Sequence, residues 1–270
     1  MNQRRRDARM MREQILSSGI TIQQDFREAT RFVMFQTGVA DYATHGGTAF
    51  VVNYHYKPYA LTCLHVPQDF EWSQLVITDV RFGTHFAPLK SVQYASDAKE
   101  TAVDADILDV AVIEFREAIT ADFFKGSAYI IDPNTVGTSA VGNRLYVAGF
   151  LKDLSSIGEK IDAVSCLLEF QDDGPADHDT TLRRAIAEFD RPEFERVTGL
   201  SGAPVFDATT KKLCGMVTRA GRDGSRWTLH YVDVRDIMHL LDTVHTRKAT
   251  TSYRKTIVRK PPPDPSRPIR

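Results

Sequence analysis

The sequence predicts an all-β protein, a barrel or a sandwich, with one helix near the end of its folded part. Three observations favour this fold class. Short segments rich in Val, Ile, Phe, Tyr and Thr recur along the chain, Gly, Pro, Asp and Asn separate them, and no strand–helix–strand alternation occurs. An apolar fraction of 42% and a charged fraction of 26% are ordinary for a globular domain and exclude a disordered chain.

Ten segments have the composition of β-strands. Some alternate apolar and polar residues, as a strand covered on one face does, and others are apolar throughout. A turn-rich segment at 132–143 divides them into lobes of about 30–128 and 129–246, which would leave a cleft suited to a ligand or to catalysis. The predicted strands are RFVMFQ (31–36), TAFVVNY (48–54), YALTCL (59–64), QLVITDV (74–80), DVAVIEF (109–115), RLYVAGF (144–150), AVSCLLEF (163–170), APVFD (203–207), KLCGMVT (212–218) and WTLHYVDV (227–234).

Two helices are predicted, over residues 7–17 and 233–245. The second is the stronger prediction because apolar residues recur at three- and four-residue steps, at Val234, Ile237, Leu241 and Val244.

Both ends of the chain are basic. Residues 1–12 carry a local charge of +4 and residues 247–270 carry +7, so the net charge of −1 leaves −1 − 4 − 7 = −12 for residues 13–246. We expect flexible extensions at 1–29 and 247–270, and a proline-rich, extended run at 260–270. Such tails are mostly solvated, so we do not expect nucleic acid as a partner; the alternative is salt-sensitive binding of nucleic acid or an acidic protein.

Cysteine usage and hydropathy indicate a cytoplasmic protein. The three cysteines (Cys63, Cys166 and Cys214) cannot all pair and form no CxxC motif, so neither a disulfide scaffold nor a zinc ribbon is expected. The basic run at the start is followed by no apolar stretch of the kind found in a secretory signal. No segment has the roughly 18 consecutive apolar residues of a membrane-spanning helix, so no membrane partner is expected.

Three short segments carry residues suited to nucleophilic catalysis. GGTAFVVNYHYKPYALTCLHV (46–66) includes His65 after an apolar strand, DILDVAVIEF (106–115) has Asp109 at the start of another, and TGLSGAPVFD (198–207) has Ser201 between glycines. A serine hydroxyl becomes an effective nucleophile when a histidine accepts its proton and a carboxylate orients that histidine. Glycines beside the serine allow a tight turn in which the Gly199 and Ser201 amides can bind an oxyanion.

These segments resemble the trypsin-like (chymotrypsin-fold) serine proteases, and most nearly the bacterial, HtrA-type branch without a PDZ module. His65 in LTCLHV matches the family's LTAAH-type histidine, Asp109 in DVAVIEF its D-I-A-type aspartate, and Ser201 in GLSGAP its G-x-S-G-G-P serine. The order His, Asp, Ser is also that of the family. The resemblance implies a double six-stranded β-barrel over 30–246, a serine endopeptidase activity, a polypeptide substrate and no cofactor.

The resemblance also places a substrate pocket and leaves its specificity open. Residues about six before the serine and the strand after Gly215 would line it. The first of these groups comprises Glu195 and Arg196, and the second comprises Thr218, Arg219 and Ala220. A glutamate at the floor would favour a basic side chain and an arginine on the wall an acidic one. The charged segment 171–196 is predicted to be a long surface loop that covers or regulates the cleft.

Departures from the family pattern concern activation. Leu200 stands where digestive proteases have an aspartate that pairs with a newly cut N-terminus, so that activation route is closed to this chain. Restraint by a regulatory protein partner is therefore the expectation.

Several histidines and one further aspartate have simpler interpretations. Asp106 is the alternative to Asp109, and we favour Asp109 because the apolar run begins directly after it. His45, His55 and His85 are interpreted as surface or loop residues rather than metal ligands, because they share no helix face and pair with no cysteine. We expect no metal site.

Two functions remain open on the sequence. The first is an active endopeptidase, which we favour because all three triad side chains are present. The second is a catalytically silent trypsin-like domain that binds peptides or partners as a sensor.

Overall fold

A computed structural model describes residues 26–36, 43–67, 70–81, 83, 85–94, 109–152, 155–157, 161–163, 165–177, 179–187, 198–223 and 226–246. The predicted helix at 7–17 and the basic tail at 247–270 lie outside these residues. No helix among the described residues has the length and apolarity that a membrane crossing requires.

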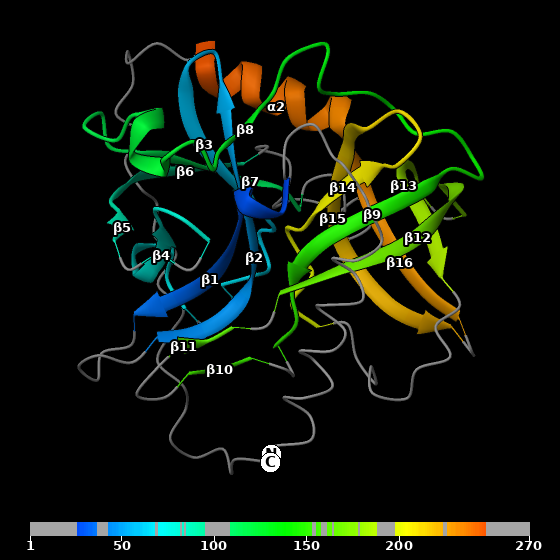
Figure 1. The fold of residues 1–270 in the computed structure, drawn as a ribbon, viewed down its shortest axis with the longest axis horizontal. Coiled ribbons are helices and arrows are strands. Elements are labelled where there is room, and N and C mark those ends of the chain that lie inside the picture. The colour runs from blue at the N-terminus through cyan, green and yellow to red at the C-terminus, as the bar shows by residue number, and fades with distance from the viewer. Residues whose placement is uncertain are drawn as a thin grey trace.

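The first half of the molecule is an eight-stranded sheet (Figure 1). Seven strands follow the order β5-β4-β1-β2-β3-β7-β6, and β8 pairs in parallel with β2. Only Pro88 separates β5 from β6, so the two ends of this path are joined in sequence and the sheet curls into a barrel. Its strands are β1 (Thr30–Gln36), β2 (Ala43–Tyr54), β3 (Lys57–Thr62), β4 (Leu75–Thr78), β5 (Phe86–Ala87), β6 (Leu89–Tyr94), β7 (Ala111–Phe115) and β8 (Tyr129–Ile130), with short 3-10 helices η1 (Phe26–Ala29), η2 (Trp72–Gln74) and η4 (Ala121–Phe124).

The second half is a closed six-stranded barrel, in the order β12-β13-β16-β15-β14-β9. Its strands are β9 (Arg144–Phe150), β12 (Ser165–Ala176), β13 (Asp179–Ala187), β14 (Pro204–Asp207), β15 (Lys212–Asp223) and β16 (Arg226–Asp233), and a small hairpin of β10 (Ser156–Ile157) and β11 (Ile161–Asp162) lies apart from it. The fold class predicted from the sequence is confirmed. The second barrel has the predicted six strands, and the first has seven in its path.

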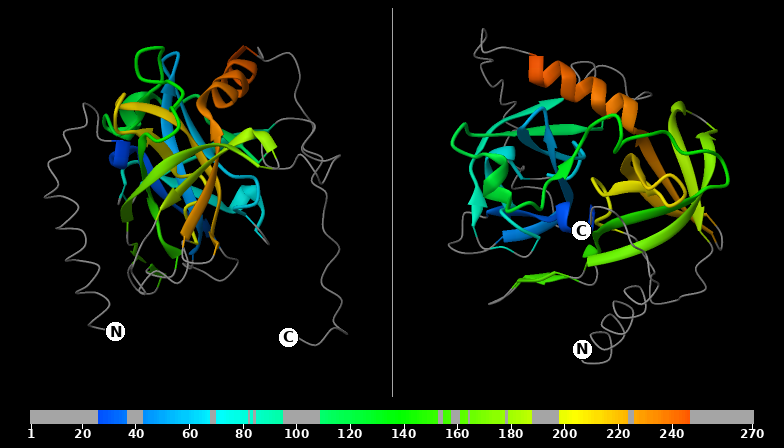
Figure 2. Two further views of the ribbon diagram at one scale, coloured as in Figure 1. Left: turned by 90° about the vertical axis from the view of Figure 1, so that its right-hand side faces the viewer. Right: turned by 45° about the horizontal axis from the view of Figure 1, so that its top comes forward.

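The helix α2 (Val234–Thr246) follows the last strand and lies across the top of both halves (Figures 1 and 2). Its four predicted apolar residues are all buried. Asp233 caps its start, because its Oδ1 accepts the backbone N–H of Arg235 at 2.9 Å. Near its end, Asp242 accepts a hydrogen bond of 2.5 Å from the Tyr54 hydroxyl of β2. α2, which follows the last strand of the second barrel, is therefore hydrogen-bonded to the first barrel.

Aromatic side chains join the two halves into one core. Phe206 of β14 stacks on Phe26 of η1 with ring centroids 3.8 Å apart, and its ring meets that of Phe50 of β2 edge-on at 6.4 Å. All three side chains are buried. Phe26 belongs to this core although it precedes residue 30, the predicted start of the folded domain. The predicted domain boundaries otherwise remain a prediction.

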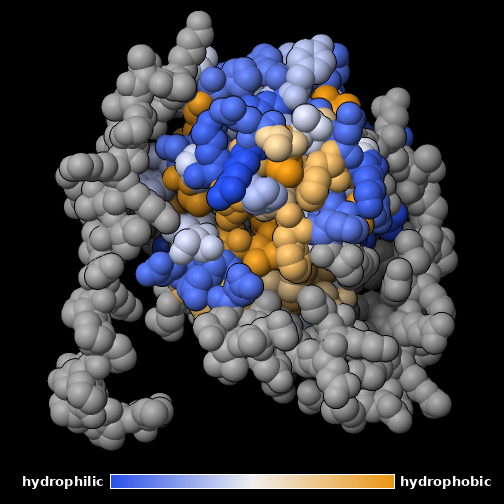
Figure 3. All heavy atoms as spheres, turned by 90° about the vertical axis from the view of Figure 1, so that its left-hand side faces the viewer, coloured by the Kyte–Doolittle hydropathy of each residue, from blue (hydrophilic) through white to orange (hydrophobic). Residues whose placement is uncertain are grey.

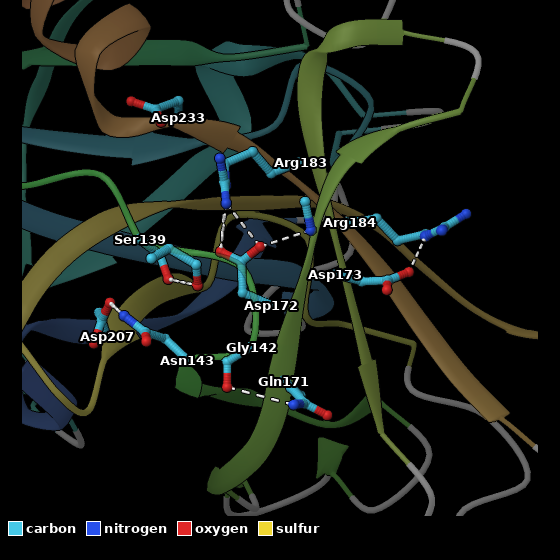
Figure 4. A network of polar contacts seen from close by, with 12 residues as sticks. Ser139, Gly142, Asn143, Gln171, Asp172, Asp173, Arg183, Arg184, Asp207 and Asp233 are labelled. Atoms are coloured by element: carbon cyan, nitrogen blue, oxygen red, sulfur yellow. Dashed lines mark hydrogen bonds and ion pairs between the residues drawn. The ribbon is translucent and has the colours of Figure 1, made fainter.

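One prediction about local structure was wrong. The segment 171–196 is not a long surface loop over its described part, because β12 continues to Ala176 and β13 runs from Asp179 to Ala187. These strands form a hairpin that closes the second barrel. The charged residues of this segment include an ion pair between the buried Asp172 and the half-buried Arg183, drawn in Figure 4. Residues 188–196 lie outside the described residues.

Large exposed apolar side chains are few among the described residues. They are Tyr56, Phe86, Ile130 and Val141. Phe86 belongs to β5, at the end of the first sheet's strand path. Figure 3 shows the molecule from the side on which β4 and β5 lie in Figure 1, where apolar residues form a patch surrounded by hydrophilic ones.

Candidate active site

The register of two strands brings His65 and Asp109 together. β3 and β7 pair antiparallel, with Thr62 opposite Ala111. His65 lies three residues after Thr62 and Asp109 two residues before Ala111. Both residues therefore lie at the same end of this strand pair. The turn after β3 is closed by a backbone hydrogen bond of 3.2 Å from Val66 N to Cys63 O.

Asp109 uses both carboxylate oxygens on the same histidine. Oδ2 lies 2.6 Å from His65 Nδ1, and Oδ1 accepts the His65 backbone N–H at 3.1 Å. Because an ionised carboxylate only accepts hydrogen bonds, Nδ1 carries the proton and Nε2 keeps its lone pair. Asp109 thus fixes both the orientation and the tautomer of the ring.

Ser201 comes from the second half, in the turn that precedes β14. Its Oγ lies 2.8 Å from His65 Nε2 and 3.3 Å from the carbonyl oxygen of Thr218. The His65 side chain is 48% exposed and that of Asp109 is 12% exposed, so the pair opens to solvent on the histidine side. The structure brings together the three side chains that the sequence singled out, over separations of 44 and 136 residues.

Two glycines shape the serine turn. Gly199 has φ of 100° and Gly202 has φ of 90°, a backbone region that favours glycine. At Gly202 a side chain is also excluded by space, because a Cβ there would lie 2.0 Å from the carbonyl oxygen of Thr48. The turn that carries Ser201 therefore requires the glycine that follows it.

The amides of Gly199 and Ser201 are available to a ligand. The Thr198 carbonyl accepts Lys152 N–H at 2.9 Å, and the Leu200 carbonyl accepts Ala203 N–H at 2.8 Å. Because the C=O and N–H of a trans peptide point in opposite directions, these bonds turn the Gly199 and Ser201 N–H groups the other way. Within the described residues neither amide has an acceptor.

Thr48 of β2 is a site residue that the sequence analysis missed. Its hydroxyl donates to the Gly199 carbonyl at 2.8 Å, and its backbone N–H donates to the Ser201 carbonyl at 3.0 Å. The segment GGTAFVV that contains it was recognised only as a strand. A polar residue directly after two glycines was the available signal, but only the three-dimensional contact identifies its partner.

The strand predicted to hold substrate is β15, and its two neighbouring strands pair with it over different lengths. β14 pairs with β15 only as far as Met216, whereas β16 pairs with it to Asp223. A bulge falls at Thr218, which is buried, while Arg219 is exposed and Ala220 is half-buried. Glu195 and Arg196, the other predicted pocket residues, lie outside the described residues.

The histidines set aside as non-ligands have other partners. His85 Nδ1 lies 3.3 Å from Asp79 Oδ2, a carboxylate that also binds Lys125, and the His55 ring lies 5.0 Å from that of His245. The side chain of His45 and the whole of Asp106 lie outside the described residues.

One group among the described residues has the spacing of a metal site. The candidate ligand atoms of Cys63, His65 and Asp109 all lie within 4.8 Å of one another. His65 and Asp109 bind each other, however, and the buried Cys63 thiol donates to the Val217 carbonyl at 3.2 Å. The geometry of this group is that of a hydrogen-bonded dyad with a neighbouring structural thiol. The expectation that the protein needs no metal stays a prediction.

Comparison with known proteins rests on structure alone. No protein-family model matches the sequence, and no curated protein matches it. The chain is similar in structure to human heparin binding protein, with a TM-score of 0.58 and 13% identity over 83% of this chain and 93% of that one. It is also similar to an inactivated protease paralogue of the scabies mite (TM-score 0.53, 13% identity, 83% and 98% covered).

A third similar structure is AL20, a thermostable serine protease from an extremophilic microorganism (TM-score 0.51, 12% identity, 82% and 99% covered). Identities this low speak for the fold only, and the HtrA-type branch stays a prediction. The two β-barrels, the helix that follows them and these similarities agree: the chain has the chymotrypsin fold of the trypsin-like serine proteases.

Proposed function

We propose that this chain is a serine endopeptidase that hydrolyses peptide bonds through His65, Asp109 and Ser201. The single observation that carries the proposal is the unbroken hydrogen-bond chain from Asp109 Oδ2 through the His65 ring to Ser201 Oγ, with contacts of 2.6 and 2.8 Å. A nucleophile beside a base that is itself oriented by a third group is the arrangement acyl transfer requires.

Each group has a defined step. His65 Nε2 takes the proton of Ser201 Oγ as that oxygen attacks the scissile carbonyl carbon. Asp109 stabilises the resulting imidazolium. The amides of Gly199 and Ser201 donate to the oxyanion of the tetrahedral intermediate, and His65 then gives the proton to the leaving amine. Water repeats the sequence on the acyl-enzyme and releases the second product.

The substrate in this proposal is an extended polypeptide. We assign the substrate strand to β15 from Thr218 to Ala220, which lies beyond the pairing with β14 and within the pairing with β16. We propose a cytoplasmic location, control by a partner protein and no cofactor; nucleic acid and membrane have no part in the scheme.

A fluorophosphonate probe and a peptide library test the activity. The wild-type protein should be labelled at Ser201 and should cleave library peptides, whereas Ser201→Ala should lose labelling and retain only residual turnover. Ser73→Ala is the matched control, because the Ser73 hydroxyl is bonded to Glu71 and not to a triad residue, and it should label as the wild type does.

A silent peptide-binding domain is the alternative function. The inactivated protease paralogue of the scabies mite is an example of a similar fold without activity. Complete triad geometry in this chain favours activity over that alternative. Absence of labelling and of cleavage in the folded wild-type protein would decide for the silent domain.

A further inference from the structure

We infer that Thr48 is a positioning residue that holds the serine turn in the form that leaves the oxyanion amides free. The inference rests on the proposed function and adds to it a residue from the first barrel, outside the triad. The observation that supports it is that both the side chain and the backbone of Thr48 form hydrogen bonds with the turn 199–202.

The Thr48 hydroxyl bridges two parts of the second barrel. It donates to the Gly199 carbonyl at 2.8 Å and accepts the Phe150 backbone N–H, at the end of β9, at 3.0 Å. A hydroxyl is suited to this place because it donates and accepts through one atom. With its donor used on Gly199 and its acceptor on Phe150, the hydroxyl fixes the carbonyl that follows the first oxyanion amide.

The Thr48 backbone continues the same contact. Its N–H donates to the Ser201 carbonyl at 3.0 Å, and its carbonyl accepts the Thr62 hydroxyl at 2.9 Å. The carbonyl is also the atom that a Cβ at Gly202 would meet at 2.0 Å. Thr48 thus contacts the turn before, at and after the nucleophile.

Tight packing keeps this arrangement from relaxing. Thr48 and Leu200 are fully buried. A Cβ on Gly149 would lie 2.8 Å from Leu200 Cδ2, 3.0 Å from Thr48 Oγ1 and 3.1 Å from Ala203 Cβ. Since these groups pack closely and Thr48 is buried, loss of the hydroxyl removes its hydrogen bonds to the Gly199 carbonyl and the Phe150 N–H at a place shielded from solvent.

No charge is needed to hold the turn. Leu200, which stands before the nucleophile, is buried in the apolar core of the second barrel with Leu145, Val147 and Ala185. The apolar packing of Leu200 on one side and the Thr48 hydrogen bonds on the other therefore hold the turn, where an aspartate at position 200 would need a cationic partner.

Thr48→Val tests the hydroxyl with little change of shape. We expect kcat/KM and the rate of fluorophosphonate labelling to fall about 10²-fold, as expected for small displacements of a reacting geometry, mainly through kcat. Thr48→Ser keeps the hydroxyl and should stay within about threefold of the wild type. Thr78→Val is the matched control: Thr78 is a buried threonine whose hydroxyl donates to the Val80 carbonyl at 2.7 Å, and its loss should alter stability alone.

Hydrogen exchange of the segment 198–203 gives a readout independent of activity. The N–H groups of Gly202 and Ala203 are hydrogen-bonded, to Val217 and Leu200. They should exchange at least tenfold faster in Thr48→Val than in the wild type, Thr48→Ser or Thr78→Val. If Thr48→Val does not fold, Thr48→Ala is measured in the same assays.

The outcomes separate the two proposals. A folded Thr48→Val or Thr48→Ala protein with the labelling rate and the exchange rates of the wild type overturns the role of Thr48. A Thr48→Ser protein that lacks the wild-type labelling rate and exchange rates also overturns it. A wild type that neither labels nor cleaves overturns the protease function, while faster exchange in the same experiment would still support the hold of Thr48 on the turn.

Discussion

The two halves of this molecule each bury a charged side chain, and they do so in opposite ways. In the first half, the Arg31 guanidinium is fully buried and donates to the backbone carbonyls of Glu28, Thr30, Thr78 and Asp79 and to the Ser127 hydroxyl. Burial lowers the pKa of Arg31 to about 10, and the nearby acids Glu28 and Asp79 oppose the shift. Arg31 therefore stays charged at neutral pH, and among the described residues it forms no direct ion pair.

In the second half, the buried carboxylate of Asp172 is paired with the half-buried guanidinium of Arg183. Arg183 donates to both carboxylate oxygens of Asp172, with the shortest contact at 2.7 Å (Figure 4). The Tyr231 hydroxyl donates to the same carboxylate at 2.6 Å. Burial raises the pKa of Tyr231 far above its usual range. Burial alone would lower the pKa of Arg183. The interactions with Asp172 and Tyr231 have the larger combined effect, so the pKa of Arg183 is raised.

The difference teaches what each barrel depends on. Arg31 ties η1 and β1 to the chain after β4 and to the segment at Ser127, so its hydrogen bonds stabilise the entry of the chain into the first barrel. Asp172 and Arg183 lie on the hairpin of β12 and β13, and Tyr231 on β16, so the pair links three adjacent strands. Loss of one partner leaves neutral carbonyls unpaired in the first case and a full charge in the second.

Asp172→Ala should have the largest effect on stability. It leaves the Arg183 charge and the Tyr231 hydroxyl without their acceptor in the second barrel, and we expect a loss of about 3–5 kcal/mol in the free energy of unfolding. Denaturant titration measures this loss. Asp173→Ala is the control on the neighbouring residue, because Asp173 pairs with Arg184 at 2.6 Å in a half-exposed position and should lose under about 1 kcal/mol. Equal losses in the two variants would refute the comparison.

Arg31→Leu should rank second. Four carbonyls and one hydroxyl lose a donor, some of which regain partners on relaxation, and no charge is left behind; we expect a loss of about 2–3 kcal/mol. The control is Arg144→Leu, since Arg144 is exposed and its contact with Glu169 is 3.8 Å. It should change the unfolding free energy by under about 0.5 kcal/mol. A loss larger than that of Asp172→Ala would reverse the proposed order.

A triple variant, Asp172→Leu with Arg183→Met and Tyr231→Phe, sharpens the comparison. It removes the whole polar group, so no charge remains unpaired, and its stability should return to within about 1 kcal/mol of the wild type. Chemical denaturation of the triple variant beside Asp172→Ala provides the measurement. Stability as low as that of the single variant would mean that the ion pair itself, rather than the absence of an unpaired charge, stabilises the barrel.

The smallest expected effect is a pH dependence where α2 braces the first half. Burial, together with the charges of His55 and Lys57, lowers the pKa of His245, while Asp242 opposes the shift. Its Nδ1 lies 3.0 Å from the Tyr59 hydroxyl. Because the folded state favours neutral His245, stability is complete above the unfolded value of about 6.5 and declines as pH falls below it.

Thermal melts between pH 7.5 and 5.5 test this sign. The melting temperature of the wild type should fall more over this range than that of His245→Gln, which cannot gain the proton. Parallel curves for the two proteins would show that His245 has no part in the pH dependence.

Strand positions and the triad were largely predictable from the sequence. The strands are apolar and β-branched, so local composition was enough for them. The triad was predictable because three short motifs that adjoin such strands, in the order His, Asp, Ser, resemble those of the trypsin-like proteases. The hairpin at 171–187 was not predictable in this way. Gly174, with φ of 93°, and Pro175 resemble a turn, yet both lie in β12, where the register shifts around them.

The many charged residues of the same segment led to the wrong prediction of a surface loop. Asp172 and Asp173 are adjacent, but strand alternation buries the first and leaves the second half-exposed. Only the partner strand β13, eleven residues away, shows that Arg183 compensates Asp172. Thr48 escaped notice for a related reason, since its partners lie more than a hundred residues along the chain.

The triad is divided unequally between the two barrels: its imidazole and its carboxylate adjoin strands of the first, and its hydroxyl belongs to the second. A displacement between the barrels would therefore lengthen the Oγ–Nε2 contact and leave the Nδ1–Oδ2 contact unchanged. Activation of the serine thus depends on the fit between the barrels, whereas the orientation of the histidine depends on the first barrel alone.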